Sequence, residues 1–95
     1  MVKTSSHIIY INNKKTSIRL TQTEWNAVNT ICEKENLKRT NLFNLINQNK
    51  NKELSLTASI RLFSIIYFQK MLLSKFYINK TQHSQPIFDA IKGIT

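Results

Sequence analysis

The chain has 95 residues, enough for one small domain, and its 14 lysines and arginines against 5 aspartates and glutamates give a formal charge of +9. This excess of cations favours nucleic acid or another anionic surface as the partner. A single cysteine, Cys32, excludes an intramolecular disulfide and gives no sign of export. The most apolar run, residues 62–68, is far shorter than the ~20 residues of a membrane span, so we expect a soluble cytoplasmic protein without a membrane partner.

Two short strands are expected near the N-terminus. Residues 7–11 are rich in β-branched and aromatic side chains, which favour a strand, with a disordered arm as the alternative. Asn12 and Asn13 follow, and asparagine tolerates the left-handed backbone of a tight hairpin turn. Residues 14–20 would form the returning strand, in which side chains alternate between two faces. One face holds Thr16, Ile18 and Leu20, and the other holds Lys15, Ser17 and Arg19.

Three helices are expected after the hairpin. Thr21 or Thr23 can cap the first helix, which ends at Asn36, a residue that tolerates the left-handed conformation common at helix ends. Residues 38–40 open the second helix. The third helix, residues 54–75, is apolar around its whole circumference. Such a helix must bury more than one face, which favours a second subunit.

These elements predict a mainly α fold with a short β-hairpin or ribbon, in the α+β class. They divide the chain into a flexible N-terminus (residues 1–7), a folded domain (residues 8–76) and a C-terminal tail (residues 77–95). Pro86 is expected to break any helix in the tail. The tail residues able to dock back onto the domain are Ile87, Phe88 and Ile91.

Three motifs occur in order between residues 8 and 70. The first is residues 16–20, Thr-Ser-Ile-Arg-Leu, followed by an aromatic residue, Trp25, in the next helix. The second is Asn36-Leu37 at the end of that helix, and the third runs from Leu56 to Phe68. Together they resemble the ribbon-helix-helix superfamily of the Arc and Met repressors. The resemblance is closest to a bacterial subgroup with an extra N-terminal strand and a third helix.

The resemblance implies a homodimer, or a tetramer on DNA, in which an antiparallel ribbon of two strands enters the major groove of double-stranded DNA. By position, the base-contacting residues would be Lys15, Ser17 and Arg19. The start of the second helix would hold a backbone phosphate, through Lys38, Arg39 and Thr40. The shared dimer core would be Ile18, Leu20, Trp25, Val28, Leu42 and Ile46. Lys38 departs from the family pattern, in which a capping serine or threonine is common at this position.

We therefore interpret the chain as a dimeric DNA-binding protein and a transcriptional regulator, not an enzyme, with no cofactor or metal site. His7, Cys32 and His83 are scattered without the spacing of metal ligands, and the only glycine, Gly93, excludes a glycine-rich phosphate loop. The alternative is a protein-interaction module, antitoxin-like or another dimeric adaptor, that uses the third helix and the tail. A basic peptide for membrane surfaces fits worst, because the cations do not line one face of the apolar helix.

Several of these residues have plainer structural roles as alternatives. Arg19 could be a solvated charge that protects a strand edge from aggregation, and Lys38 and Arg39 could be ordinary loop cations. Trp25 fits a core position better than a stacking platform. An N-terminal strand that covered the ribbon would block the groove and weaken the DNA interpretation.

Overall fold

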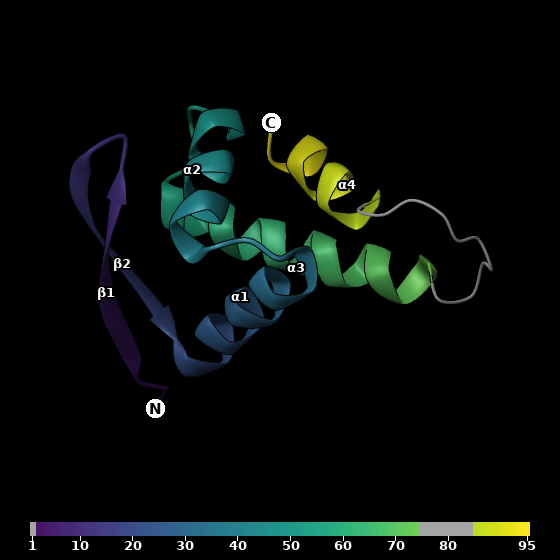
Figure 1. The fold of residues 1–95 in the computed structure, drawn as a ribbon, viewed down its shortest axis with the longest axis horizontal. Coiled ribbons are helices and arrows are strands. Elements are labelled where there is room, and N and C mark those ends of the chain that lie inside the picture. The colour runs from purple at the N-terminus through teal and green to yellow at the C-terminus, as the bar shows by residue number, and fades with distance from the viewer. Residues whose placement is uncertain (1, 75–84) are drawn as a thin grey trace.

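The computed structural model describes residues 2–74 and 85–95 of the chain. A hairpin of two strands, β1 (Thr4–Ile11) and β2 (Lys14–Thr21), precedes the helices. The helices of the described part are α1 (Gln22–Glu35), α2 (Arg39–Asn49), α3 (Leu56–Ser74) and α4 (Gln85–Ile94). The hairpin lies along one side of the molecule against α1 and α2, and α4 lies over α3 on the other side (Figure 1). The expected α+β class, a hairpin followed by a mostly helical chain, is confirmed.

The hairpin is antiparallel, with Ile11 opposite Lys14 and Thr4 opposite Thr21. Asn12 and Asn13 form its turn with φ of 52° and 65°. A two-residue turn of this kind needs positive φ at both positions, which asparagine adopts more readily than most residues. Strand β1 begins at Thr4, so most of the segment expected to be a flexible N-terminus pairs with β2. Met1 lies outside the described residues.

Helix α1 is closed at both ends by its own residues. The Thr21 hydroxyl accepts a hydrogen bond from the Glu24 amide at 3.1 Å, and the Glu24 carboxylate accepts one from the Thr21 amide at 2.8 Å. This reciprocal pair is a capping box, which satisfies amides that the helix itself cannot pair. At the other end Asn36 has φ of 56° and its amide donates back into the last turn, as the sequence predicts.

One hydrophobic core fills the space between the hairpin and the helices. The six residues predicted for a shared dimer core are each at most 2% exposed within this single chain: Ile18, Leu20, Trp25, Val28, Leu42 and Ile46. The other buried apolar residues come from β1, α1, α2, α3 and α4. The chain's own elements therefore cover these six side chains, and a core shared between two chains stays a prediction.

The C-terminal segment differs from the expected tail, because residues 85–94 form α4. Pro86 is the second residue of this helix, where its missing amide hydrogen costs nothing. Ile87 is buried and Ile91 packs against the core, whereas Phe88 is 62% exposed. The Asn51 amide donates to the Ile94 carbonyl oxygen at 2.7 Å, which ties the end of α4 to the loop before α3. The rest of the expected tail, residues 77–84, lies outside the described residues.

Helix α3 runs along the core with Ile60, Phe63 and Tyr67 on its buried stripe. By length and composition alone, its segment Leu56–Leu73 could cross a membrane. This is weak evidence for a membrane protein, because the core helix of a soluble protein passes the same test.

The Tyr67 hydroxyl donates to the Glu35 carboxylate at 2.7 Å, and burial together with that carboxylate raises the pKa of Tyr67. Tyr67 therefore stays protonated and joins α3 to the end of α1.

Candidate nucleic-acid interface

The outer face of the hairpin, on the side away from the helices, is exposed. The alternation predicted from sequence is observed in β2, because Ile18 and Leu20 are buried while Lys15, Ser17 and Arg19 are exposed. The register places one residue of β1 beside each of these three on the same face. The outer face consists of Ser6, Ile8 and Tyr10 from β1 and Lys15, Ser17 and Arg19 from β2. Strand β1 lies at the edge of β2 and does not cover this face.

The hairpin carries only positive charge. Residues 2–21 contain four cations, Lys3, Lys14, Lys15 and Arg19, and no aspartate or glutamate. All four cationic side chains are exposed. Arg19 is held in place by its Nε, which donates to the Ser6 hydroxyl oxygen at 3.1 Å. The two terminal nitrogens of the guanidinium are not used by this bond, so they can still donate to an acceptor in front of the face.

The start of α2 has no side-chain cap. Lys38 occupies the N-cap position with extended backbone, and its side chain makes no capping hydrogen bond. The first turn of α2 also lacks an acidic residue. The amides at a helix start have no partner within the helix, and the helix dipole makes this end positive. The exposed side chains of Lys38 and Thr40 border this end, which can therefore accept an anion.

Arg39, the first residue of α2, is already engaged within the chain. Its guanidinium carbon lies 4.8 Å from the centre of the Trp25 ring, and its Nη2 donates to the Asn29 side-chain oxygen at 2.8 Å. Trp25 and Asn29 are four residues apart in α1 and so share a face of that helix. Arg39 therefore fixes the start of α2 against α1. The sequence prediction of a phosphate contact did not include this role, although the shared face of Trp25 and Asn29 was visible in the sequence.

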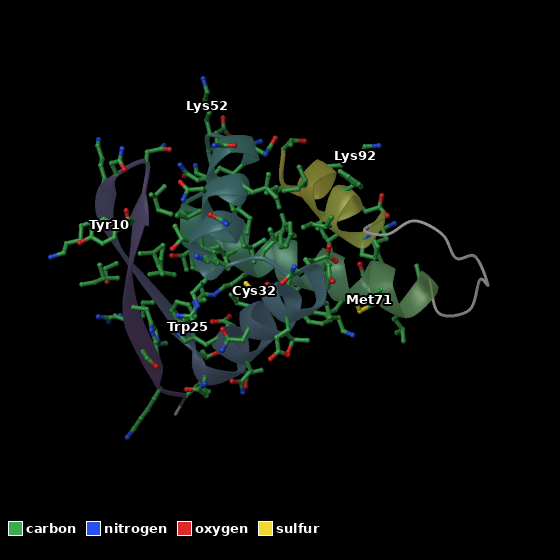
Figure 2. All side chains as sticks on the ribbon, viewed as in Figure 1. Tyr10, Trp25, Cys32, Lys52, Met71 and Lys92 are labelled. Carbon is green, nitrogen blue, oxygen red and sulfur yellow. The ribbon has the colours of Figure 1, made fainter. Side chains whose placement is uncertain are left out.

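The structure does not bring all six predicted DNA-contacting residues onto one surface. Trp25 lies between the hairpin and the helices (Figure 2). Its ring packs against His7 of β1, with ring centres 4.1 Å apart, and its indole N–H donates to the Ser5 carbonyl oxygen at 3.0 Å. Arg39 stacks on this same buried ring, whereas Lys15, Ser17 and Arg19 lie on the opposite side of the hairpin. The structure therefore places Arg39 on the inner side of the hairpin, away from the predicted base contacts.

The family model described as the ribbon-helix-helix domain matches residues 4–68 of the chain. The chain belongs to the ribbon-helix-helix family. The matched region begins with the first residue of β1 and ends within α3, so it contains both candidate surfaces and leaves α4 outside. No curated protein and no solved structure matches the chain. Membership of this family points to a DNA-binding regulator or an antitoxin-like role, and such domains are typically not enzymes.

This ribbon-helix-helix chain also has a groove between α1 and α3 that the sequence did not indicate. Its volume is about 300 Å³, and its lining is largely apolar. The lining residues are Thr23, Glu24, Ala27, Ile60, Arg61, Ser64, Ile65 and Phe68. At its border the Arg61 Nε donates to the Glu24 carboxylate at 2.8 Å. Arg61 therefore joins α3 to the first turn of α1 through Glu24.

Cys32 lies in an environment that disfavours a reactive thiolate. Cys32 is half-buried against the core, and burial raises the pKa of its thiol although the charge of Arg39 acts in the opposite direction. A raised pKa lowers the fraction of the reactive thiolate. Among the residues that the structure describes, no cluster of histidine, cysteine, aspartate or glutamate could hold a metal ion. His83 lies outside the described residues.

Proposed function

We propose that this chain is a dimeric DNA-binding protein, a transcriptional regulator that inserts an antiparallel β-ribbon into the major groove. The observation that carries the proposal is the outer face of the hairpin, which is exposed, positively charged and free of acidic residues. A two-stranded ribbon has the right width for the major groove, and phosphates attract such a surface from a distance. Membership of the ribbon-helix-helix family supports the same function.

Within this proposal, Arg19 carries most of the sequence preference. Its guanidinium can donate two hydrogen bonds to the O6 and N7 atoms of guanine, which discriminates by about 1–3 kcal/mol against another base. The bond from Arg19 to Ser6 restricts the side chain before it meets DNA, which reduces the entropy lost on binding. Ser17 is short and accepts several base edges, and Lys15 offers a mobile charge at the hairpin end.

The start of α2 holds a backbone phosphate in the same proposal. Lys38 and Thr40 are exposed beside unpaired amides at the positive end of the helix, which suits an anion. Arg39 contributes chiefly by fixing that helix start against Trp25 and Asn29. Phosphate contacts of this kind orient the protein but carry no sequence information.

The test is fluorescence polarisation with mixed DNA fragments over a series of salt concentrations. We expect log affinity to fall steeply with log salt, because each phosphate contact releases counterions. Arg19→Ala should weaken binding to the preferred fragments by about 1–3 kcal/mol, and to random fragments by less. Lys92→Ala, which removes an exposed cation on α4 far from the hairpin, is the control (Figure 2). Weak binding that is unchanged in Arg19→Ala would contradict the proposal.

A second candidate function, an antitoxin-like or other dimeric adaptor that binds a protein, is favoured by the apolar surface of the C-terminal helices. Ile65, Leu72 and Leu73 on α3 and Phe88 on α4 are 51–62% exposed. Ile65 also lines the groove between α1 and α3. Large exposed apolar side chains of this kind are typical of protein-binding surfaces. The salt series separates the two candidates, because an adaptor without a DNA function would show no fragment preference that depends on Arg19.

A further inference from the structure

The outer edge of β1, on the side away from β2, is an open strand edge. The two-residue turn makes Ile11 and Lys14 a hydrogen-bonded pair, and along an antiparallel hairpin such pairs alternate with pairs whose backbone groups point away from the partner strand. The register therefore directs the amides and carbonyls of Thr4, Ser6 and Ile8 away from β2. In the part of the chain that the structure describes, the amides of Ser6 and Ile8 have no hydrogen-bond partner.

The open part of this edge covers residues 4–8 and ends before the turn. Tyr10 also directs its carbonyl away from β2, but the Asn44 side-chain nitrogen of α2 donates to that oxygen at 3.4 Å. The same side chain accepts a hydrogen bond from the Asn12 amide at 3.2 Å. Helix α2 therefore occupies the end of the edge near the turn and leaves the other end open.

β1 lacks the residues that usually protect an edge strand. Soluble proteins place lysine, other charged residues or proline on such strands, because open backbone groups otherwise pair with another chain. β1 has eight residues and contains no lysine, arginine, aspartate, glutamate or proline. Its side chains Ile8 and Tyr10 are each 57% exposed. A long, uncharged and partly apolar edge of this kind is suited to the addition of a strand.

We infer that the open edge of β1 pairs in antiparallel orientation with the same edge of a second copy of the chain, and so joins two dimers. The inference goes beyond the proposed function and takes from it only the dimer, in which β2 pairs with β2 of the partner subunit. In that dimer the two β2 strands are central, and one β1 edge stays open on each side of the sheet. The β2 edge then builds the dimer, and the β1 edge links one dimer to the next.

The open edge is complementary to itself. When Ser6 lies opposite Ser6 of the partner subunit, the two-fold symmetry places Ile8 opposite Thr4 of the partner subunit on both sides. These three residue pairs would exchange about six backbone hydrogen bonds, two for each pair. Ile8 and Thr4 are both β-branched and lie on the outer face, so each such pair also makes a cross-strand contact between side chains.

Charge also favours this edge as the meeting point of two copies. The chain has a formal charge of +9, so two copies repel each other over much of their surface. Residues 4–8 contain no lysine or arginine, and Lys15 and Arg19 belong to β2, one strand further from the contact. A second β1 strand supplies the alternating donors and acceptors that this edge requires, and it brings no like charge directly against it.

The test uses proline variants at two opposed positions of the hairpin. Ile8 and Ser17 face each other in the register, and each directs its amide away from the other strand. Proline lacks the amide hydrogen and is tolerated at edge positions, so neither variant removes a bond between β1 and β2. Size-exclusion chromatography with light scattering gives the mass in multiples of 11.1 kDa over a series of concentrations. Fluorescence polarisation measures DNA binding on the same samples.

Wild type should reach the mass of four or more chains as the concentration rises. Ile8→Pro should stop at the mass of two chains and keep the DNA binding that depends on Arg19. Ser17→Pro opens the β2 edge and should lose that binding. Ile8→Thr keeps the amide and the β-branched shape, so this matched control should keep the wild-type mass. Circular dichroism verifies the fold, and Ile8→Lys, which places a charge on the edge strand, replaces Ile8→Pro if the proline variant is unfolded.

The outcomes separate this inference from the proposed function. A wild type that binds DNA but stays a dimer at every concentration overturns the inference and leaves the proposed function standing. Equal masses for wild type and Ile8→Pro also overturn it, and so does dissociation of Ile8→Thr, because the side chain and not the strand edge would then hold the dimers together. Assembly that is lost in Ile8→Pro, in a protein that does not bind DNA, supports the inference and contradicts the proposed function.

Discussion

The start of α1 is capped by its own side chains, whereas the start of α2 is not. At α1, Thr21 and Glu24 exchange hydrogen bonds, and Glu24 also pairs with Arg61 of α3. At α2, Lys38 stands at the N-cap with no side-chain hydrogen bond and no acidic residue follows in the first turn. At both ends the first amides lack a partner within the helix, and the helix dipole makes the end positive. The difference between them is that one is completed within the chain and the other remains open to an anion.

Two similar helix starts are thus suited to different roles, the start of α1 to stability and the start of α2 to anion binding. A capped end contributes to stability and leaves nothing for a ligand. An uncapped end forgoes about 1 kcal/mol of stability and keeps its positive charge available. Trp25 connects the two, because it belongs to the first turn of α1 and carries Arg39 of α2 on its ring.

Of the predicted changes in stability, the largest should follow the removal of the Trp25 side chain, which connects the two helix starts. Trp25→Ala deletes a side chain that is 2% exposed and packs against β1 and α2, so we expect a loss of about 3–5 kcal/mol in the free energy of unfolding. Urea denaturation followed by circular dichroism measures it. Phe88→Ala, at an exposed position, should change stability by less than about 0.5 kcal/mol. A loss below 1 kcal/mol in Trp25→Ala would contradict the role of this residue as the link between the two helix starts.

Adding a side-chain cap to α2 should raise the stability of the protein and lower its affinity for DNA. Lys38→Asp supplies an acceptor for the first amides of α2 and should raise the free energy of unfolding by about 0.5–1 kcal/mol. The same change removes a cation and places a carboxylate where the proposed function places a backbone phosphate. The slope of log affinity against log salt should therefore decrease by about 1.

Two further variants serve as controls for Lys38→Asp. Lys52→Asp makes the same change in net charge in the exposed loop after α2, and it should leave stability near the wild-type value. Thr21→Ala makes the opposite change, because it removes the cap of α1. We expect a loss of about 1 kcal/mol in the free energy of unfolding and an unchanged salt slope. An equal salt slope in Lys38→Asp and Lys52→Asp would show that the start of α2 makes no phosphate contact.

The pH dependence of Glu24 should give the smallest effect. Burial raises the pKa of this carboxyl, but the hydrogen bond from the Thr21 amide, the bond and charge of Arg61 and the Thr21 hydroxyl outweigh it, so the pKa is lowered from 4.5. A lowered pKa in the folded state stabilises the protein above pH 4.5, and this contribution is lost as the pH falls below that value. Because both partners are partly exposed, we expect roughly 0.5 kcal/mol or less. The urea midpoint of wild type should fall more between pH 6 and pH 3 than that of Glu24→Gln.

Local signals in the sequence were sufficient for the hairpin and for α1. The alternation of β2 depends only on which residues follow one another, and the turn at Asn12 and Asn13 needs only their tolerance of positive φ. The box formed by Thr21 and Glu24 is a contact between residues three apart. Features of this kind are encoded over a few residues, so they can be predicted from the chain alone.

The features that could not be predicted depend on contacts between distant elements. Arg39 was expected to be free for phosphate, and its stacking on Trp25 arises only when α2 packs against α1. α4 is absent from the predicted elements because proline breaks most helices, although it is well tolerated in a first turn. Its buried residues Ile87, Ala90 and Ile94 follow a helical spacing that a search for helix periodicity beyond Pro86 would have found.

The hairpin is fastened to the helices near both of its ends. Near the turn, the Asn12 amide donates to the side-chain oxygen of Asn44 in α2 at 3.2 Å. Near the other end, the Trp25 indole donates to the Ser5 carbonyl oxygen. A free arm would lose its conformational freedom when it bound DNA, and that loss would weaken binding. Here that freedom is given up during folding, so under the proposed function the hairpin would meet DNA already ordered.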